Sequence, residues 1–164
     1  MPVCDFYVAQ FNPTVASAST TAVASLIAAT TKRAWVTGVR VRVTSTGAAA
    51  GSTVNIELAR PANTPTGTSL SAVAANDYSG AASISSVCTT WSTAPTPSAA
   101  LGGTPAEYEL PLAAGAMWAE FPPDGQEWGV PALGNTAANT GLHVFITQSV
   151  ATSSVYSIDL IFSE

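Results

Sequence analysis

The sequence predicts an all-β protein, a single β-sandwich domain of jelly-roll-like topology that spans residues 1–164. Short apolar stretches recur along the chain, and most of them alternate apolar and polar residues with a period of two. Clusters of Gly, Pro, Asn and Ser separate these stretches. About ten short strands with such turns are typical of a sandwich or jelly roll, and a chain of this length favours one domain.

The clearest strand covers residues 35–43. Its apolar positions share one face, which we expect to point into the core: Trp35, Val39, Val41 and Val43. Arg40 and Arg42 alternate with them and point the other way. Residues 54–58 repeat the pattern, with Val54, Ile56 and Leu58 inward and Asn55 and Glu57 outward. In residues 107–112 both Glu107 and Glu109 fall on the exposed side.

Two strong strands close the chain, at residues 142–147 and 155–162. Weaker candidate strands are 3–11, 21–29, 68–73, 84–91, 116–121 and 127–133, and Pro131 places the last of them at an edge or an irregular end. The alanine-rich residues 15–30 are the one helix candidate. Their Ser, Thr and Val content, without caps or charges, favours strand instead. Residues 59–68 and 92–106 read as long connecting loops.

Composition excludes several functions. The formal net charge of −5 opposes non-specific binding to nucleic acid, which depends on Lys and Arg. No apolar run approaches the length that spans a bilayer, and the first residues lack the features of a secretory signal, so we expect neither a membrane nor a secretory route. Cys4 and Cys88 do not make a disulfide framework.

The residues of catalysis are sparse. His143 is the only histidine and lies within an apolar strand, where a side chain on the second face of the sheet is the favoured interpretation. Metal-ligand spacing, a nucleophile elbow and a phosphate-binding glycine loop are all missing. Glu107 and Glu109 are two apart on one strand, which is typical of a solvated face. We therefore expect no catalytic residue, no cofactor and no metal.

Aromatic residues offer one alternative, a platform for sugar rings. Trp35 and Trp118 alternate with apolar neighbours and are expected in the core. Trp91 and Trp128 lie beside loops and are the candidate exposed aromatics. Core or interface packing remains the favoured role for all four.

The charges are unevenly distributed. All five basic residues lie between 32 and 60, and eight of the ten acidic residues follow from Asp77 onward. Two alternatives stay open: pairing within the fold, for example of Arg40 or Arg42 with Glu57, or contact between neighbouring copies. For the second, the candidate interface residues are Arg40, Arg42, Glu107 and Glu109.

The scarcity of lysine indicates how the surface is used. Sheet edges of monomers are commonly protected by Lys, Pro or bulges, and this chain has a single lysine. Its surface must be largely Ser, Thr, Ala and Gly, which lose little entropy on ordering. Such a surface suits a protein that packs against others.

In the order and texture of its segments the whole chain resembles the small jelly-roll capsid decoration proteins of tailed bacteriophages. The resemblance rests on the Ala/Ser/Thr-rich residues Val15–Thr31, the run Lys32–Val39, the run Val54–Arg60, the Thr/Gly loop Thr64–Thr68, Glu107–Leu112, Trp118 and the run Gly141–Phe145. It implies a virion protein that binds the major capsid lattice, often as a homotrimer, and catalyses nothing. It also implies assembly in the host cytoplasm, where thiols stay reduced. The alternative function is a carbohydrate-binding β-sandwich, a fibre or host-recognition module with a glycan as its ligand.

Overall fold

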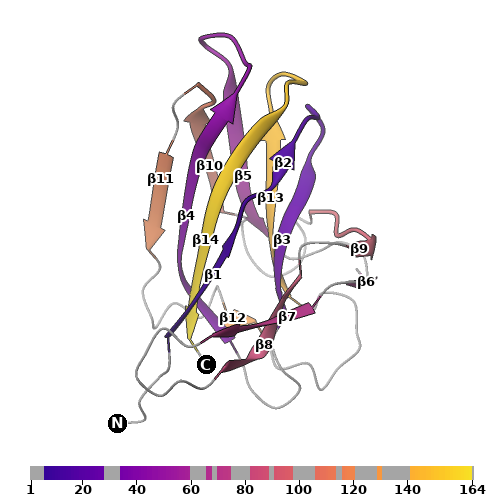
Figure 1. Ribbon diagram of the computed structural model, residues 1–164, viewed down its shortest axis with the longest axis vertical. Coiled ribbons are helices and arrows are strands. Elements are labelled where there is room, and N and C mark those ends of the chain that lie inside the picture. Colours follow the sequence, from indigo (N-terminus) through magenta and orange to yellow (C-terminus); the bar gives the residue numbers. More distant parts are fainter. Residues whose placement is uncertain are drawn as a thin grey trace.

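The computed structural model confirms the predicted β-sandwich. It describes residues 6–27, 34–59, 66–67, 70–74, 82–88, 91–97, 106–113, 116–120, 129–130 and 141–163. Every regular element in these ranges is a β-strand, and the strands build two antiparallel sheets that pack against each other (Figure 1). The described ranges hold no helix long and apolar enough to cross a membrane.

The first sheet, called sheet A, has β1, β14, β4 and β11 in spatial order, with β2 beside β14 and β12 beside β4. Its strands are β1 (Phe6–Phe11), β2 (Thr14–Val15), β4 (Ala34–Thr46), β11 (Ala116–Glu120), β12 (Gly129–Val130) and β14 (Ser154–Ser163). Sheet A lies in front in Figure 1.

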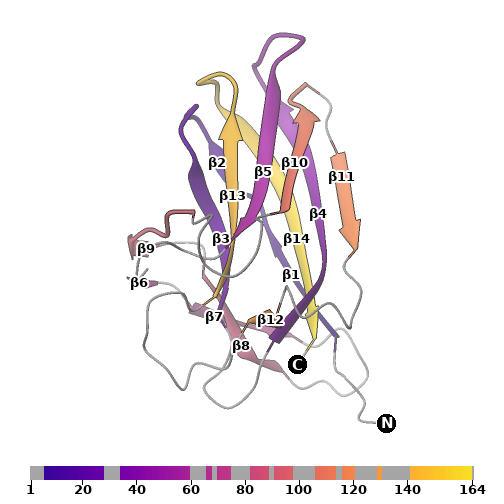
Figure 2. The ribbon, with the colours of Figure 1, turned by 180° about the vertical axis from the view of Figure 1, so that it is seen from behind.

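The second sheet, called sheet B, has the order β10, β5, β13, β3, β8 and β7, and its strands face the viewer in Figure 2. Its strands are β3 (Thr21–Ile27), β5 (Thr53–Ala59), β7 (Leu70–Ala74), β8 (Ala82–Cys88), β10 (Ala106–Pro111) and β13 (Leu142–Gln148). A separate two-stranded ribbon joins β6 (Thr66–Gly67) and β9 (Trp91–Thr93) and lies beside β3 (Figures 1 and 2).

The structure confirms the strand predicted in residues 15–30 but shows that the two expected loops contain strands. Within residues 15–30, β3 confirms the preference for strand over helix. Residues 59–68 and 92–106 are not wholly loops, because β6 lies within the first and pairs with β9, which begins at Trp91 and continues into the second. Short Thr-rich and Trp-containing segments pair here although neither shows a clear alternation, so periodicity could not find them.

The interlayer core confirms the alternation read from the sequence. Val54, Ile56 and Leu58 on β5 are fully buried, whereas Asn55 and Glu57 are only partly covered. Sheet A contributes four side chains of β14 to the same core. They are Tyr156, Ile158, Leu160 and Phe162, each at most 1% exposed. The ring of Phe162 also stacks on Tyr7 of β1, with centroids 5.3 Å apart. These side chains hold the two sheets together by burying apolar surface.

The prediction for Trp35 is wrong. Opposite β14, Ile161 pairs with Gly38 and Phe162 pairs with Val36, so Thr37 is an extra residue on β4. Such a β-bulge reverses the alternation along the strand that carries it. Val36 is therefore buried at 3% exposure, while Trp35 is only half-buried and does not belong to the core.

Candidate functional site

The two sheets place Arg40 and Arg42 on a different outer face from Glu57. Arg40 and Arg42 alternate with the buried Val39 and Val41, so they lie on the outer face of sheet A. Glu57 alternates with buried residues of β5 and lies on the outer face of sheet B. The two faces are on opposite sides of the sandwich. Pairing of Arg40 or Arg42 with Glu57 within one chain is therefore excluded.

Each arginine has a different neighbourhood on sheet A. Arg40 is half-buried, in register with Asp159 on one side and with Trp118 on the other. Arg42 is exposed between Ser157 and Ala116, and it makes no ion pair with any described residue. Among the described residues of this face, Arg42 is thus an accessible cation.

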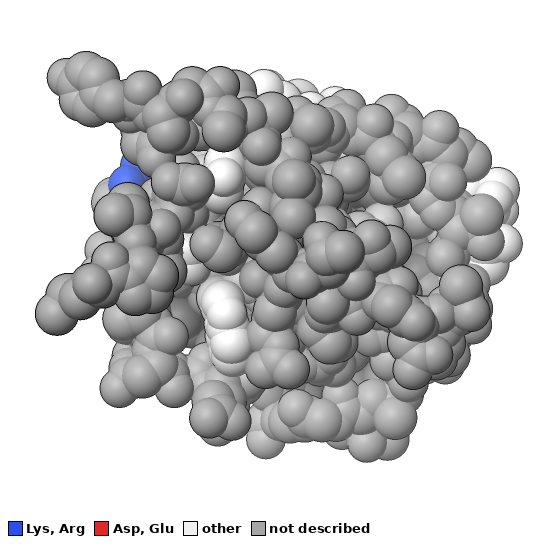
Figure 3. Space-filling model, turned by 90° about the horizontal axis from the view of Figure 1, so that it is seen from below, with Lys and Arg blue, Asp and Glu red and all other residues white. Residues whose placement is uncertain are grey.

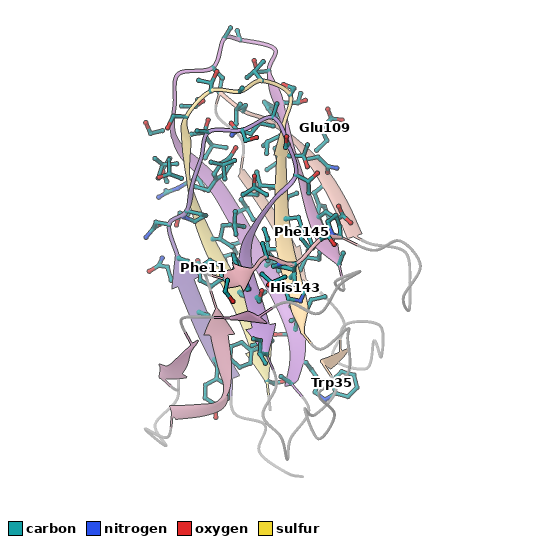
Figure 4. All side chains as sticks on the ribbon, turned by 90° about the vertical axis from the view of Figure 1, so that its right-hand side faces the viewer. Phe11, Trp35, Glu109, His143 and Phe145 are labelled. Carbon is teal, nitrogen blue, oxygen red and sulfur yellow. The ribbon has the colours of Figure 1, made fainter. Side chains whose placement is uncertain are left out.

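Sheet B carries Glu57 on β5 and Glu107 and Glu109 on its edge strand β10, whereas Asp159 and Glu120 belong to β14 and β11 of sheet A. In register, Glu107 of β10 lies opposite Glu57 and Glu109 lies opposite Asn55. Like charges directly across two strands repel each other. Glu109 is exposed, points away from the sandwich in Figure 4, and has no ion-pair partner in the described ranges. The side chain of Glu107 lies outside the described residues.

Outside these two areas the described surface shows little charge. From below, Figure 3 shows one small basic area and no acidic area on the described part of that face. Exposed residues at the opposite end are small or hydroxyl-bearing, among them Thr44, Ser45, Ala50 and Ser153. The sandwich therefore exposes polar but mostly uncharged surfaces there.

Of the two candidate exposed aromatics, the described residues include Trp91. Trp91 is half-buried, and its indole Nε1 is enclosed without a hydrogen-bond partner. That nitrogen is therefore not available to donate to a sugar hydroxyl group. Trp128 and the side chain of Trp118 lie outside the described residues.

His143 occupies the second face of β13, as the alternation predicted. Its ring and the Ser25 side chain of β3 are both fully buried, and Nδ1 of His143 lies 2.5 Å from Oγ of Ser25. Phe145 packs nearby, with ring centroids 6.1 Å apart, and Figure 4 shows both rings on β13. A hydroxyl beside an imidazole is the pairing used in nucleophilic catalysis. Here neither group has an exposed atom for a substrate to reach, so the contact joins β3 to β13.

Sequence reasoning missed Ser25 and one further buried polar contact. Ser25 is 118 residues from His143, and nothing local marks it as a partner. Gln148 is 2% exposed, and its Nε2 donates to the carbonyl oxygen of Val15 at 2.9 Å, which ties β13 of sheet B to β2 of sheet A. Both contacts depend on strand pairing that periodicity does not define.

Burial also strongly shifts the pKa of one tyrosine, Tyr156. The Tyr156 side chain is fully enclosed, and burial raises the pKa of Tyr156 to about 12, although the nearby Ser154 hydroxyl lowers it somewhat. The Ser154 Oγ is itself 2.7 Å from Oγ1 of Thr46. No described group makes a hydrogen bond of normal geometry to the Tyr156 hydroxyl.

No group of three or more His, Cys, Asp or Glu side chains in the described residues is arranged to hold a metal ion. The chain matches no protein-family model, and a search of the curated proteins finds no relative. The surfaces and the fold therefore carry the functional argument.

Proposed function

We propose that this chain is a non-enzymatic structural protein of a bacteriophage virion, a decoration protein that binds the capsid lattice and reinforces it as a homotrimer. The observation that carries the proposal is an all-β sandwich whose described surface is weakly charged, with the exposed Arg42 on sheet A and the exposed Glu109 on the edge strand of sheet B. A protein that works by contact needs surfaces that select their partners, and complementary charge supplies that selection.

The strand order supports the finer assignment of a jelly roll. With β1 and β2 taken as one strand, and β12 and the insertion β6 to β9 set aside, eight strands remain. In chain order, sheet A then holds strands one, eight, three and six, and sheet B holds five, four, seven and two. This interleaving is what two Greek keys folded together would produce.

The mechanism of reinforcement is linkage between binding and assembly. A rigid sandwich that contacts two capsid subunits at once binds the closed shell and loses that binding when the subunits separate. Binding to one state only raises the free energy needed to leave that state. No bond is made or broken in this role, and no cofactor is needed.

The test uses purified protein and undecorated capsid shells of the virus that encodes the chain. We expect the protein to sediment with the shells until its sites are saturated, and saturated shells to break at a higher temperature than bare ones. Mass spectrometry of purified virions should detect the chain. Failure to add to shells, or absence from virions, would overturn the proposal.

Glycan binding is the competing function, and the experiment must distinguish it from binding to capsid shells. Binding to a glycan array at micromolar affinity, without binding to shells, would favour a host-recognition module. The enclosed indole Nε1 of Trp91 argues against that outcome at this residue.

A further inference from the structure

We propose that His143 makes sheet B acid-sensitive: when its ring takes up a second proton, the pairing between β3 and β13 opens locally. We call this line of pairing the seam. In the described part of sheet B the seam joins β7, β8 and β3 to β13, β5 and β10. The device belongs to the fold and does not depend on capsid binding.

The ring of His143 is enclosed by its neighbours on three strands. It stands in register with Ser25 of β3 and with Ala59 of β5, and all three residues are at most 3% exposed. Phe145, the next residue on the same face of β13, is 1% exposed, with its ring centroid 6.1 Å from that of His143. A Cβ added to Gly141 would lie 3.2 Å from Nε2 of the ring. The closed seam therefore holds the imidazole away from water.

An extra proton is unfavourable in this enclosure. The Nδ1 atom of His143 lies 2.5 Å from Oγ of Ser25, a contact that a neutral ring makes without any charge. A second proton would give the ring a full positive charge in a site without solvent contact, and burial disfavours the charged form of a side chain. In an opened seam the ring reaches water and takes up that proton at about pH 6.5. Acid therefore favours the opened form.

Few charged groups face the ring from the strands packed around it. β3, β13 and the β6–β9 ribbon carry no other titratable residue. β5 contributes Glu57, which lies diagonal to His143, because its register partner is Phe145. A half-buried carboxylate about 7 Å away is screened by water and offsets only part of the cost of the charge. On β8, Cys88 is in register with Ser25, and a thiol is uncharged at acidic pH.

The seam also has an irregularity beside the histidine. The register between β13 and β3 shifts after the pair of Val144 and Ala24, so that Phe145 pairs with Ala22 and Val23 is an extra residue. Such a β-bulge locally disrupts the ladder of hydrogen bonds. The seam can therefore open near His143 while the rest of the sandwich stays folded, as local opening does in other proteins.

The expected size of the effect follows from one proton that the opened seam binds and the closed seam excludes. Below about pH 6.5 the opening equilibrium should rise up to tenfold for each pH unit. Between pH 7.5 and pH 5.5 this amounts to a rise of about tenfold.

The experiment is amide hydrogen exchange of the full chain, followed by NMR at pH 7.5 and pH 5.5 and corrected for the intrinsic exchange rates. Amides that pair β3 with β13 should show the tenfold rise in opening. Amides that pair β4 with β14 in sheet A are the internal reference and should not show it. Since His143 is the only histidine, its ring signals are unambiguous, and they should keep the neutral form at pH 5.5 in the native spectrum.

His143→Gln is the matched variant, because the glutamine amide can still bond to the Ser25 hydroxyl but does not titrate. Its seam amides should show the same opening at both pH values, whatever the level at pH 7.5. If His143→Gln does not fold, the wild-type ring signals and exchange rates decide by themselves.

Three results would overturn the proposal. The first is a His143 ring that becomes charged at about pH 6.5 while the spectrum stays native. The second is a set of seam amides that respond to pH in the same way as those of sheet A. The third is a His143→Gln variant that keeps the tenfold rise.

Discussion

At the scale of single residues, the interior of the sandwich holds two kinds of buried polar group. Ser25 and His143 are fully buried and hydrogen-bonded to each other, whereas the hydroxyl of Tyr156 is enclosed without a normal hydrogen bond from the described residues. Buried polar groups cost free energy unless they are paired. The two sites should therefore respond in opposite ways to removal of a hydroxyl group.

Ser25→Ala removes the partner of the His143 Nδ1 atom in a site that excludes water. We expect the free energy of unfolding to fall by about 1–3 kcal/mol. Urea denaturation followed by circular dichroism measures this change. Ser153→Ala, an exposed serine at the turn before β14, is the matched control and should change stability by less than about 0.5 kcal/mol. Equal effects of the two substitutions would contradict a structural role for the Ser25 contact.

Tyr156→Phe removes a hydroxyl that the fold encloses, so we expect unchanged or slightly raised stability at neutral pH. The pH dependence is more specific. The folded pKa of Tyr156 is raised to about 12 from the ordinary value of 10.0, so its proton is held more tightly in the folded state. The stability linked to this proton is fully present below pH 10 and is lost as pH rises toward 12.

The measurement is the difference in unfolding free energy between wild type and Tyr156→Phe at several pH values from 9 upward. Wild type should lose stability relative to the variant over that interval. Subtracting the variant removes the contribution of the other ionisable groups, including Tyr108, whose pKa burial also raises. A difference that does not change with pH would show that Tyr156 is not held neutral by burial.

At the scale of elements, glycines with positive φ fix where strands begin and turns form. Gly141 precedes β13 with φ of 107°, and a Cβ added there would lie 3.0 Å from the carbonyl oxygen of Leu26 and 3.2 Å from Nε2 of His143. Gly51, in the turn before β5, has φ of 89° but nothing within 4 Å of such an atom. The two positions share the backbone requirement and differ only in packing.

This contrast predicts a graded result. Gly51→Ala should cost about 1 kcal/mol, the strain of a side chain at positive φ. Gly141→Ala adds to the same strain a tight contact with the Leu26 carbonyl oxygen and the His143 ring, and we expect a loss of about 3 kcal/mol. Thermal unfolding of both variants under one condition tests the order. Equal losses would mean that β13 shifts without cost to accommodate the new methyl group.

At the scale of the whole molecule, the two sheets share one core. Leu58 on sheet B and Leu160 on sheet A are both essentially unexposed and belong to the same cluster of buried side chains. Unfolding either sheet would expose the inner face of the other. We therefore infer that the described sandwich unfolds as one unit.

Leu58→Ala and Leu160→Ala test this cooperativity. Each should lower the free energy of unfolding by about 2–5 kcal/mol, through lost burial and a residual cavity. Far-ultraviolet circular dichroism and tryptophan fluorescence should report one coincident transition in wild type and in both variants. Separate transitions for the two probes would show that the sheets are independently stable.

The sequence by itself determined the class of fold and most of the strands. A strand buried on one face must alternate apolar and polar residues, so the local sequence predicted strands at 54–58 and 155–162. The Ser, Thr and Val content of β3 predicted a strand there as well. The same alternation placed Arg40 and Arg42 on a face away from the core and His143 on the second face of its strand.

The tertiary structure decided what local periodicity cannot encode. The bulge at Thr37 turned Trp35 out of the core, because an extra residue reverses the faces of a strand and is defined only by the partner strand. Pairing between distant strands likewise brought Ser25 to His143 and Gln148 to Val15. It also put Arg42 and Glu109 on different sheets, since which sheet a strand joins depends on contacts far away in the chain.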